Sequence, residues 1–115
     1  MKRTFDTKTA DRIRDMLVDQ KIVAEKEMFN GLCFMVDDKM CICVSSEDLL
    51  CRIGAHQAEA ELEKGTCRQM IMSGRVSKDF VYVPIAENMR QEELFYWVKL
   101  CLDYNPLAKS SKKKK

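Results

Sequence analysis

The sequence has no hydrophobic run long enough to cross a membrane. A membrane-spanning helix takes roughly 20 consecutive apolar residues, and no apolar run in these 115 residues approaches that length. The N-terminal stretch MKRTFDTKTADRIRDM is charged where a secretory signal needs an apolar segment. The sequence therefore predicts a cytoplasmic protein that makes no membrane contact.

Sequence motifs of catalysis and metal binding are also missing. The chain has one histidine, His56, and no Cys-x-x-Cys pair, although such pairs are typical of tetrahedral zinc sites. It contains no Gly-x-Ser-x-Gly elbow and no glycine-rich phosphate loop. The carboxylates of Glu25, Glu27 and Asp79 are unpaired in the sequence pattern and are interpreted as solvated charges. We therefore predict a protein that is not an enzyme and has no cofactor and no metal.

Cysteine is frequent for a chain of this size. Most of the six cysteines alternate within strand patterns or lie on helical apolar stripes, where a free thiol behaves as a small hydrophobic group. Core packing is the predicted role. The alternatives are structural disulfides, and a redox sensor or metal site built on Cys33, Cys41 and Cys43. The six are Cys33, Cys41, Cys43, Cys51, Cys67 and Cys101.

Positive charge is concentrated at the C-terminus. The formal net charge is +2, but five of the lysines lie in the terminal segment LAKSSKKKK. Without residues 107–115 the chain has 15 basic and 18 acidic side chains, a net charge of about −3. A nucleic-acid-binding domain gains affinity from a basic face on the fold itself. We therefore predict nucleic acid as a weaker candidate partner than protein.

Hydrophobic periodicity predicts three helices and five strands in one domain. Asp6, Thr7 or Thr9 can cap the first helix, and Gly65 is placed to end the second. Asn88 with Gln91 forms a candidate capping box for the last helix. The first strand is predicted to bend at Gly31, and the Asp37-Asp38 pair predicts a tight hairpin turn after it. The predicted helices are 6–20, 55–64 and 89–104, and the predicted strands are 24–36, 39–44, 49–53, 67–72 and 78–84.

The resulting order is α-β-β-β-α-β-β-α. It predicts an α+β fold of two layers, with helices packed on an antiparallel or mixed sheet of about five strands. The predicted domain covers residues 1–106, and residues 107–115 are predicted to form a disordered lysine-rich tail.

Five segments, in this order, resemble the N-terminal domain family of the TfoX/Sxy proteins. They are MFNGLCFM (28–35), KMC (39–41), LCRIG (50–54), SGR (73–75) and FVYV (80–83), and the match spans roughly residues 6–104. The resemblance implies a two-layer domain similar to the secretion-chaperone-like fold. It also implies a link to regulators of bacterial competence, which act with a transcription factor rather than by catalysis.

The chain differs from these regulators in two respects. Asn30 stands where the family commonly has a glycine, and the helical second domain of the full-length regulators is absent. The resemblance brings no catalytic residues. It implies a regulatory or interaction module of the TfoX N-terminal type.

Four residues are candidates for contact with a partner or an anion. Arg52 and Arg75 are basic side chains beside segments of the family pattern, and each could instead form a structural ion pair. Trp97 and Phe29 are the aromatic candidates. The residues expected to define the fold are Met28, Phe29, Gly31, Gly54 and Gly74.

The second half of the first predicted strand, residues 32–36, is apolar on both sides, although helices of a two-layer domain cover only one side of a sheet. The other side must be covered by twist, by the last helix or by a partner. Our preferred hypothesis is therefore an interaction module that self-associates, as a possible dimer, or binds another protein through the apolar sheet face or the last helix. The alternative is a nucleic-acid-associated competence regulator that uses Arg52, Arg68, Arg75 and the lysine tail.

Overall fold

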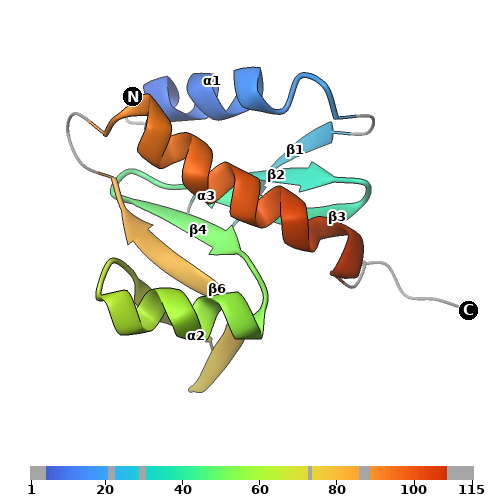
Figure 1. The fold of residues 1–115 in the computed structure, drawn as a ribbon. Coiled ribbons are helices and arrows are strands. Elements are labelled where there is room, and N and C mark those ends of the chain that lie inside the picture. The colour runs from blue at the N-terminus through green and yellow to red at the C-terminus, as the bar shows by residue number, and fades with distance from the viewer. Residues whose placement is uncertain (1–4, 21–22, 29–30, 73, 86–88, 109–115) are drawn as a thin grey trace, which may run out of the picture.

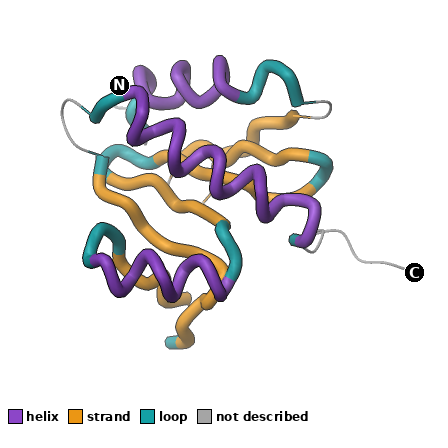
Figure 2. The backbone as a smooth tube through the Cα atoms, in the orientation of Figure 1, coloured by secondary structure: helices purple, strands orange, loops and turns teal. Residues whose placement is uncertain are grey.

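The computed structural model describes residues 5–20, 23–28, 31–72, 74–85 and 89–108. Within them, three helices cover one face of a six-stranded antiparallel sheet (Figures 1 and 2), which confirms the predicted α+β class. No helix in this part of the chain is long and apolar enough to span a bilayer. The elements are α1 (Thr7–Met16), β1 (Val23–Met28), β2 (Gly31–Val36), β3 (Lys39–Val44), β4 (Asp48–Arg52), α2 (Ala55–Lys64), β5 (Arg68–Met72), β6 (Arg75–Pro84), α3 (Gln91–Tyr104) and the 3-10 helix η1 (Asn105–Leu107).

The sheet has the strand order β1-β2-β3-β4-β6-β5. The prediction of a single bent strand over 24–36 is wrong, because this segment forms the antiparallel pair β1 and β2, with Met28 opposite Gly31. A Cβ at Gly31 would lie 2.3 Å from the carbonyl oxygen of Val44 on β3. Glycine is therefore required there by the close approach of two backbones.

The tight turn between β2 and β3 is confirmed. Asp37 and Asp38 have φ values of 56° and 65°, which are the left-handed conformations of a type I′ hairpin turn. Aspartate tolerates this conformation better than most residues.

A β-bulge interrupts the pairing of β2 with β3. Cys33 lies opposite Cys43 and Phe34 opposite Ile42, but Met35 lies opposite Met40, so Cys41 has no partner of its own on β2. Such an extra residue shifts the alternation of side chains along one strand. As a result, Cys41 joins Ile42 on the helix side of the sheet, whereas Met40 and Cys43 face the other side.

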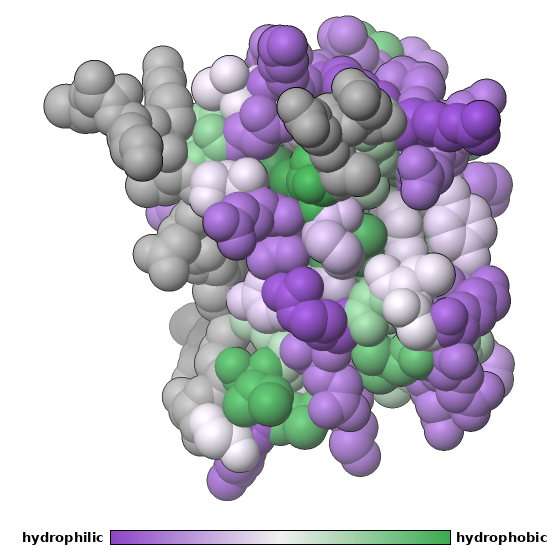
Figure 3. Space-filling view, turned by 90° about the vertical axis from the view of Figure 1, so that its left-hand side faces the viewer, coloured by the Kyte–Doolittle hydropathy of each residue, from purple (hydrophilic) through white to green (hydrophobic). Residues whose placement is uncertain are grey.

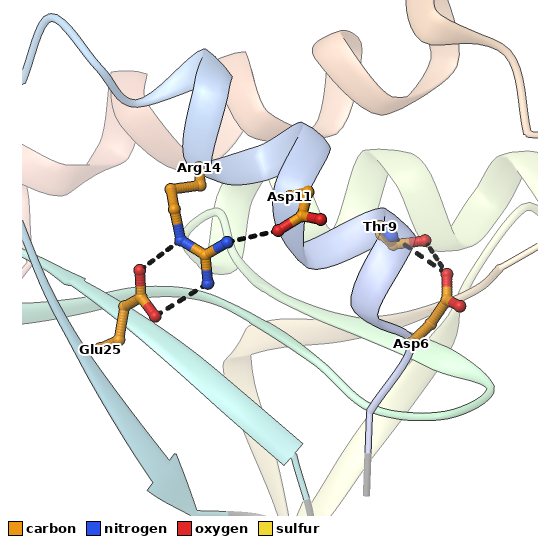
Figure 4. A network of polar contacts seen from close by, with 5 residues as sticks. All are labelled: Asp6, Thr9, Asp11, Arg14 and Glu25. Atoms are coloured by element: carbon orange, nitrogen blue, oxygen red, sulfur yellow. Dashed lines mark hydrogen bonds and ion pairs between the residues drawn. The ribbon is translucent and has the colours of Figure 1, made fainter. Parts of the chain in front are cut away.

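Helix α1 begins after Asp6, one of its three predicted caps, and an ion pair joins the helix to β1 (Figure 4). The Asp6 carboxylate accepts hydrogen bonds from the backbone N–H and the hydroxyl of Thr9. The Arg14 guanidinium donates to both carboxylate oxygens of Glu25 at 2.6 and 2.9 Å and to Asp11 at 2.5 Å. Glu25 is therefore not the purely solvated charge that the sequence pattern suggested.

The C-terminal end of α2 lies where it was predicted, but the N-terminal end of α3 does not. Gly65 ends α2 in the left-handed conformation, as predicted. Helix α3 begins after Arg90, whose backbone N–H donates to Glu93, and not after the predicted cap Asn88, which lies outside the described residues. Gly54, before α2, has φ 89°, and a Cβ there would lie 2.7 Å from the Tyr104 ring.

The two sides of the sheet carry separate apolar clusters. The helix side gathers residues of β2, β3, β4 and β6 with Ile13 of α1, Ala58 of α2 and Leu94 of α3. The opposite side, here called the open face, carries Cys33, Met35, Met40, Cys43, Leu50 and Met70, with Phe80 and Tyr82 packed against them. These six open-face residues are only 0–6% exposed. This apolar cluster of the open face is therefore buried, although none of the three helices covers it.

Candidate interaction surface

A groove of about 720 Å³ lies between α2 and the start of α3. Its apolar lining comes from the end of β6, Met89 and Trp97, and its charged lining from Glu61, Lys64, Glu92 and Glu93. The predicted contact residue Trp97 is thus part of the lining of this groove. The side of the molecule seen in Figure 3 shows hydrophobic residues as separate green patches among hydrophilic ones.

The Glu61 carboxylate is the most buried charge of this groove. Its side chain is 1% exposed, and Oε2 accepts hydrogen bonds from the Tyr96 hydroxyl at 2.5 Å, Gln57 Nε2 at 2.8 Å and Lys64 Nζ at 3.3 Å. Burial acts to raise the pKa of Glu61, but these hydrogen bonds outweigh it and lower the pKa below its usual value. Glu61 is therefore a fixed negative charge at neutral pH.

Aromatic side chains flank this charge on α3. The rings of Tyr96 and Trp97 pack edge to face with centroids 5.4 Å apart. Tyr96 is 41% exposed, and its neighbour Phe95 is 52% exposed. The hydrogen bond to Glu61 raises the pKa of the Tyr96 hydroxyl, so Tyr96 remains a donor at neutral pH. This end of α3 therefore presents aromatic surface next to a fixed carboxylate.

The other predicted contact residues lie away from this groove. Arg52, at the end of β4, stacks over the Phe80 ring at 5.4 Å. Its Nη1 donates to the Met40 carbonyl at 3.5 Å, and its buried Nε has no hydrogen-bond partner in the described part of the chain. Arg75 is exposed at the start of β6, directly after Gly74, which has φ 78°. Phe29 lies outside the described residues.

Arg68 is held by an ion pair. It donates to both carboxylate oxygens of Asp48 at 3.1 and 3.2 Å and stacks over the Tyr82 ring at 5.4 Å. The pKa of Arg68 is raised by its hydrogen bond to Asp48. The three arginines of the nucleic-acid hypothesis are therefore not equally available, because Arg52 and Arg68 are both engaged within the fold.

The cysteines divide between the two sides of the sheet. Cys33 and Cys43, directly opposite each other on the open face, form a disulfide with a Cα–Cα distance of 4.0 Å. The prediction that the cysteines serve as packed thiols is therefore wrong for this pair. It missed the disulfide because the spacing of 10 residues becomes a direct cross-strand contact only through the hairpin register.

Three free thiols lie on the helix side, where Cys101 of α3 meets Cys41 and Cys51. The hydrogen bond with Cys101, together with burial, raises the pKa of Cys41, and burial raises the pKa of Cys101. Both thiols therefore stay protonated and unreactive. A joint site of Cys33, Cys41 and Cys43 is ruled out because the bulge turns Cys41 to the opposite side. The described residues contain no group of metal-ligating side chains.

Comparison of the sequence with known protein families identifies the family of this chain. The model of the TfoX N-terminal domain matches residues 15–104. The chain belongs to the TfoX N-terminal domain family. Membership indicates a regulatory module of the competence type in a family not known to be enzymatic. No curated protein and no solved structure matches the chain.

Sequence reasoning identified Trp97 but missed its neighbours Glu61, Lys64 and Tyr96. In the sequence, Glu61 is one of three glutamates in a helix of good helix formers, and its pattern gives no sign of burial. Its helical neighbours at i−4 and i+3, Gln57 and Lys64, were the available signal. That signal is common on solvent-exposed helices and did not point to a groove.

Proposed function

We propose that this TfoX N-terminal domain is a non-enzymatic regulatory module that acts through protein–protein contacts at the α2–α3 groove. The observation that carries the proposal is the combination of the exposed Tyr96 ring, the Trp97 ring beside it and the buried Glu61 carboxylate in the lining of one groove. Aromatic residues are enriched at protein interfaces, and contacts in concave sites dominate binding energy.

The burial of the open face supports this choice. A sheet face used for docking presents a contiguous apolar patch to solvent, but the apolar residues of the open face are almost inaccessible. The helix layer, in contrast, leaves Phe95 and Tyr96 of α3 exposed, and Tyr96 lines the groove. The sequence predicted contact with a partner through the apolar sheet face or through the last helix, and the last helix is therefore the better candidate.

The alternative function is that of a nucleic-acid-associated competence regulator. It depends on phosphate contacts made by Arg52, Arg68, Arg75 and the lysine tail. Arg68 is bound at both carboxylate oxygens by Asp48, and Arg52 stacks on Phe80. Phosphate binding by these two side chains would first have to break contacts within the fold, so a protein partner is the better supported proposal.

Site-specific photo-crosslinking in the source cell tests the proposal. We would place p-benzoylphenylalanine at Thr66 or Glu92, which line the groove, and at Asp103, an exposed position farther along α3, as the matched control. We expect a discrete protein adduct from the groove positions and none from position 103. A second copy of the chain in the adduct would also support contact through the groove. No adduct, or equal adducts from all three positions, would contradict the proposal.

A further inference from the structure

We infer that the α2–α3 groove recognises a lysine-bearing segment of its protein partner, whose ammonium group takes the position that Lys64 holds. The inference rests on the proposed function and adds the chemistry of the partner.

Lys64 shows that this site binds an ammonium group. Its Nζ lies 3.3 Å from the Glu61 carboxylate and 3.4 Å from the Tyr96 hydroxyl. The same Nζ lies 5.8 Å from the centroid of the Tyr96 ring. A carboxylate and an aromatic face around one cation are the two groups that recognise an ammonium in proteins.

The Glu61 carboxylate is buried and held in place, whereas the Lys64 ammonium group is exposed to solvent. The side chain of Glu61 is 1% exposed and that of Lys64 is 57% exposed. Gln57 and Tyr96 hold Glu61 Oε2 at 2.8 and 2.5 Å independently of Lys64. A lysine from a partner can therefore replace Lys64 without changing the acceptor, and Lys64 regains full hydration when it leaves.

The remaining lining of the groove favours a basic and partly apolar segment. Of the described residues that line it, Lys64 is the only basic one, beside the acidic Glu61, Glu92 and Glu93. Once Lys64 is displaced, the groove carries an excess of negative charge, which attracts cationic and repels anionic segments. The exposed Pro84 and the Tyr96 ring provide apolar surface for a neighbouring aliphatic side chain, whereas Val83, Met89 and Trp97 line the groove but are themselves buried.

Trp97 reports occupancy of the groove directly, because it is the only tryptophan of the chain and lines this groove. We would titrate the full chain with the acetylated and amidated peptide Ala-Leu-Lys-Leu-Ala and follow the Trp97 emission. Two matched peptides carry glutamine or glutamate in place of lysine. We expect saturable binding of the lysine peptide, weaker binding of the glutamine peptide and none of the glutamate peptide.

Two substitutions test the exchange itself. Lys64→Met keeps the aliphatic chain but removes the competing ammonium, and should tighten binding of the lysine peptide about threefold. Glu61→Gln removes the charge of the acceptor and should weaken binding about tenfold. Lys99→Met and Asp103→Asn, which remove an i,i+4 ion pair on the outer surface of α3, are the matched controls and should change nothing. Circular dichroism checks that each variant is folded.

The outcomes separate this inference from the proposed function. Equal binding of the lysine and glutamine peptides, or weaker binding to Lys64→Met, would overturn the ammonium exchange and leave the groove as a protein-binding surface. The absence of binding by any peptide would also overturn the inference, and the crosslinking at Thr66 and Glu92 would then decide on the proposed function separately.

Discussion

The two faces of the sheet are buried in different ways. On the helix side, branched and aromatic side chains such as Phe34 and Leu49 pack against three helices. On the open face, Met35, Met40 and Met70 surround Leu50 and the disulfide, with Phe80 and Tyr82 packed against them. Flexible thioether side chains fill irregular spaces well. A face without helices can thus be closed by its own side chains.

This difference decides where a partner can bind. The aromatic rings at the edge of the open face are covered in turn, because Arg52 lies over Phe80 and Arg68 over Tyr82. An arginine stem can shield apolar surface while its charged head remains hydrated. Exposed apolar side chains therefore lie on α3, at Phe95 and Tyr96, and on the β5–β6 hairpin, at Ile71 and Val76, rather than in this cluster of the open face.

The largest expected effect comes from a matched pair of substitutions on β4. Leu49 faces the helices and Leu50 faces the open side, and both are buried. We predict that Leu49→Ala and Leu50→Ala each lower the free energy of unfolding by about 2–5 kcal/mol. Urea denaturation of the two variants measures this. A loss below about 1 kcal/mol for Leu50→Ala alone would show that the open face is exposed to water.

The disulfide gives the next largest effect and belongs to the open face only. Its loop has a sequence separation of 10, and opening such a short loop should cost about 2 kcal/mol of stability. We predict that a reductant lowers the midpoint of urea denaturation of the wild-type chain. A Cys33→Ala/Cys43→Ala double variant should be insensitive to the reductant. Equal sensitivity of the two proteins would place the redox effect at another pair of cysteines.

The smallest effect is expected at the ion pair that ties α1 to the edge of the sheet. The hydrogen bond from Arg14 lowers the pKa of Glu25. A lowered pKa stabilises the fold above the unfolded-state pKa, and this contribution is lost as the pH falls through the lower folded-state value. Both side chains are partly exposed, so Glu25→Gln should cost at most about 1 kcal/mol at pH 7.

The pH dependence checks the sign of this contribution. Thermal unfolding of wild type and Glu25→Gln should converge as the pH is lowered below the folded-state pKa of Glu25. Asp103→Asn, on the outer surface of α3, is the control. A difference between wild type and Glu25→Gln that grows on acidification would contradict the assigned ion pair.

Much of the fold follows from local patterns in the sequence. The helix at 55–64, its end at Gly65 and the Asp37-Asp38 turn were predicted at the observed positions. These features depend on helix propensity and on backbone conformations that few residues tolerate. Local chemistry is sufficient to predict them.

Features that depend on register were missed. The reversal between β1 and β2, the bulge at Cys41 and the Cys33–Cys43 disulfide all depend on which residues face each other across strands. Strict alternation would place Cys41 and Cys43 on the same side, and one extra residue in β3 separates them. The burial of Glu61 was missed for a similar reason, because its hydrogen bond comes from Tyr96 on α3, 35 residues away in the sequence.

Methionine oxidation tests most directly whether the open face is closed and the helix layer is left as the contact surface. The folded protein is treated with dilute hydrogen peroxide, and each methionine is followed by peptide mass spectrometry. We predict that half-buried Met16 on α1 oxidises, whereas buried Met35, Met40 and Met70 resist until the protein unfolds. Oxidation of these three residues in the folded protein, as fast as in the unfolded chain, would contradict this assignment.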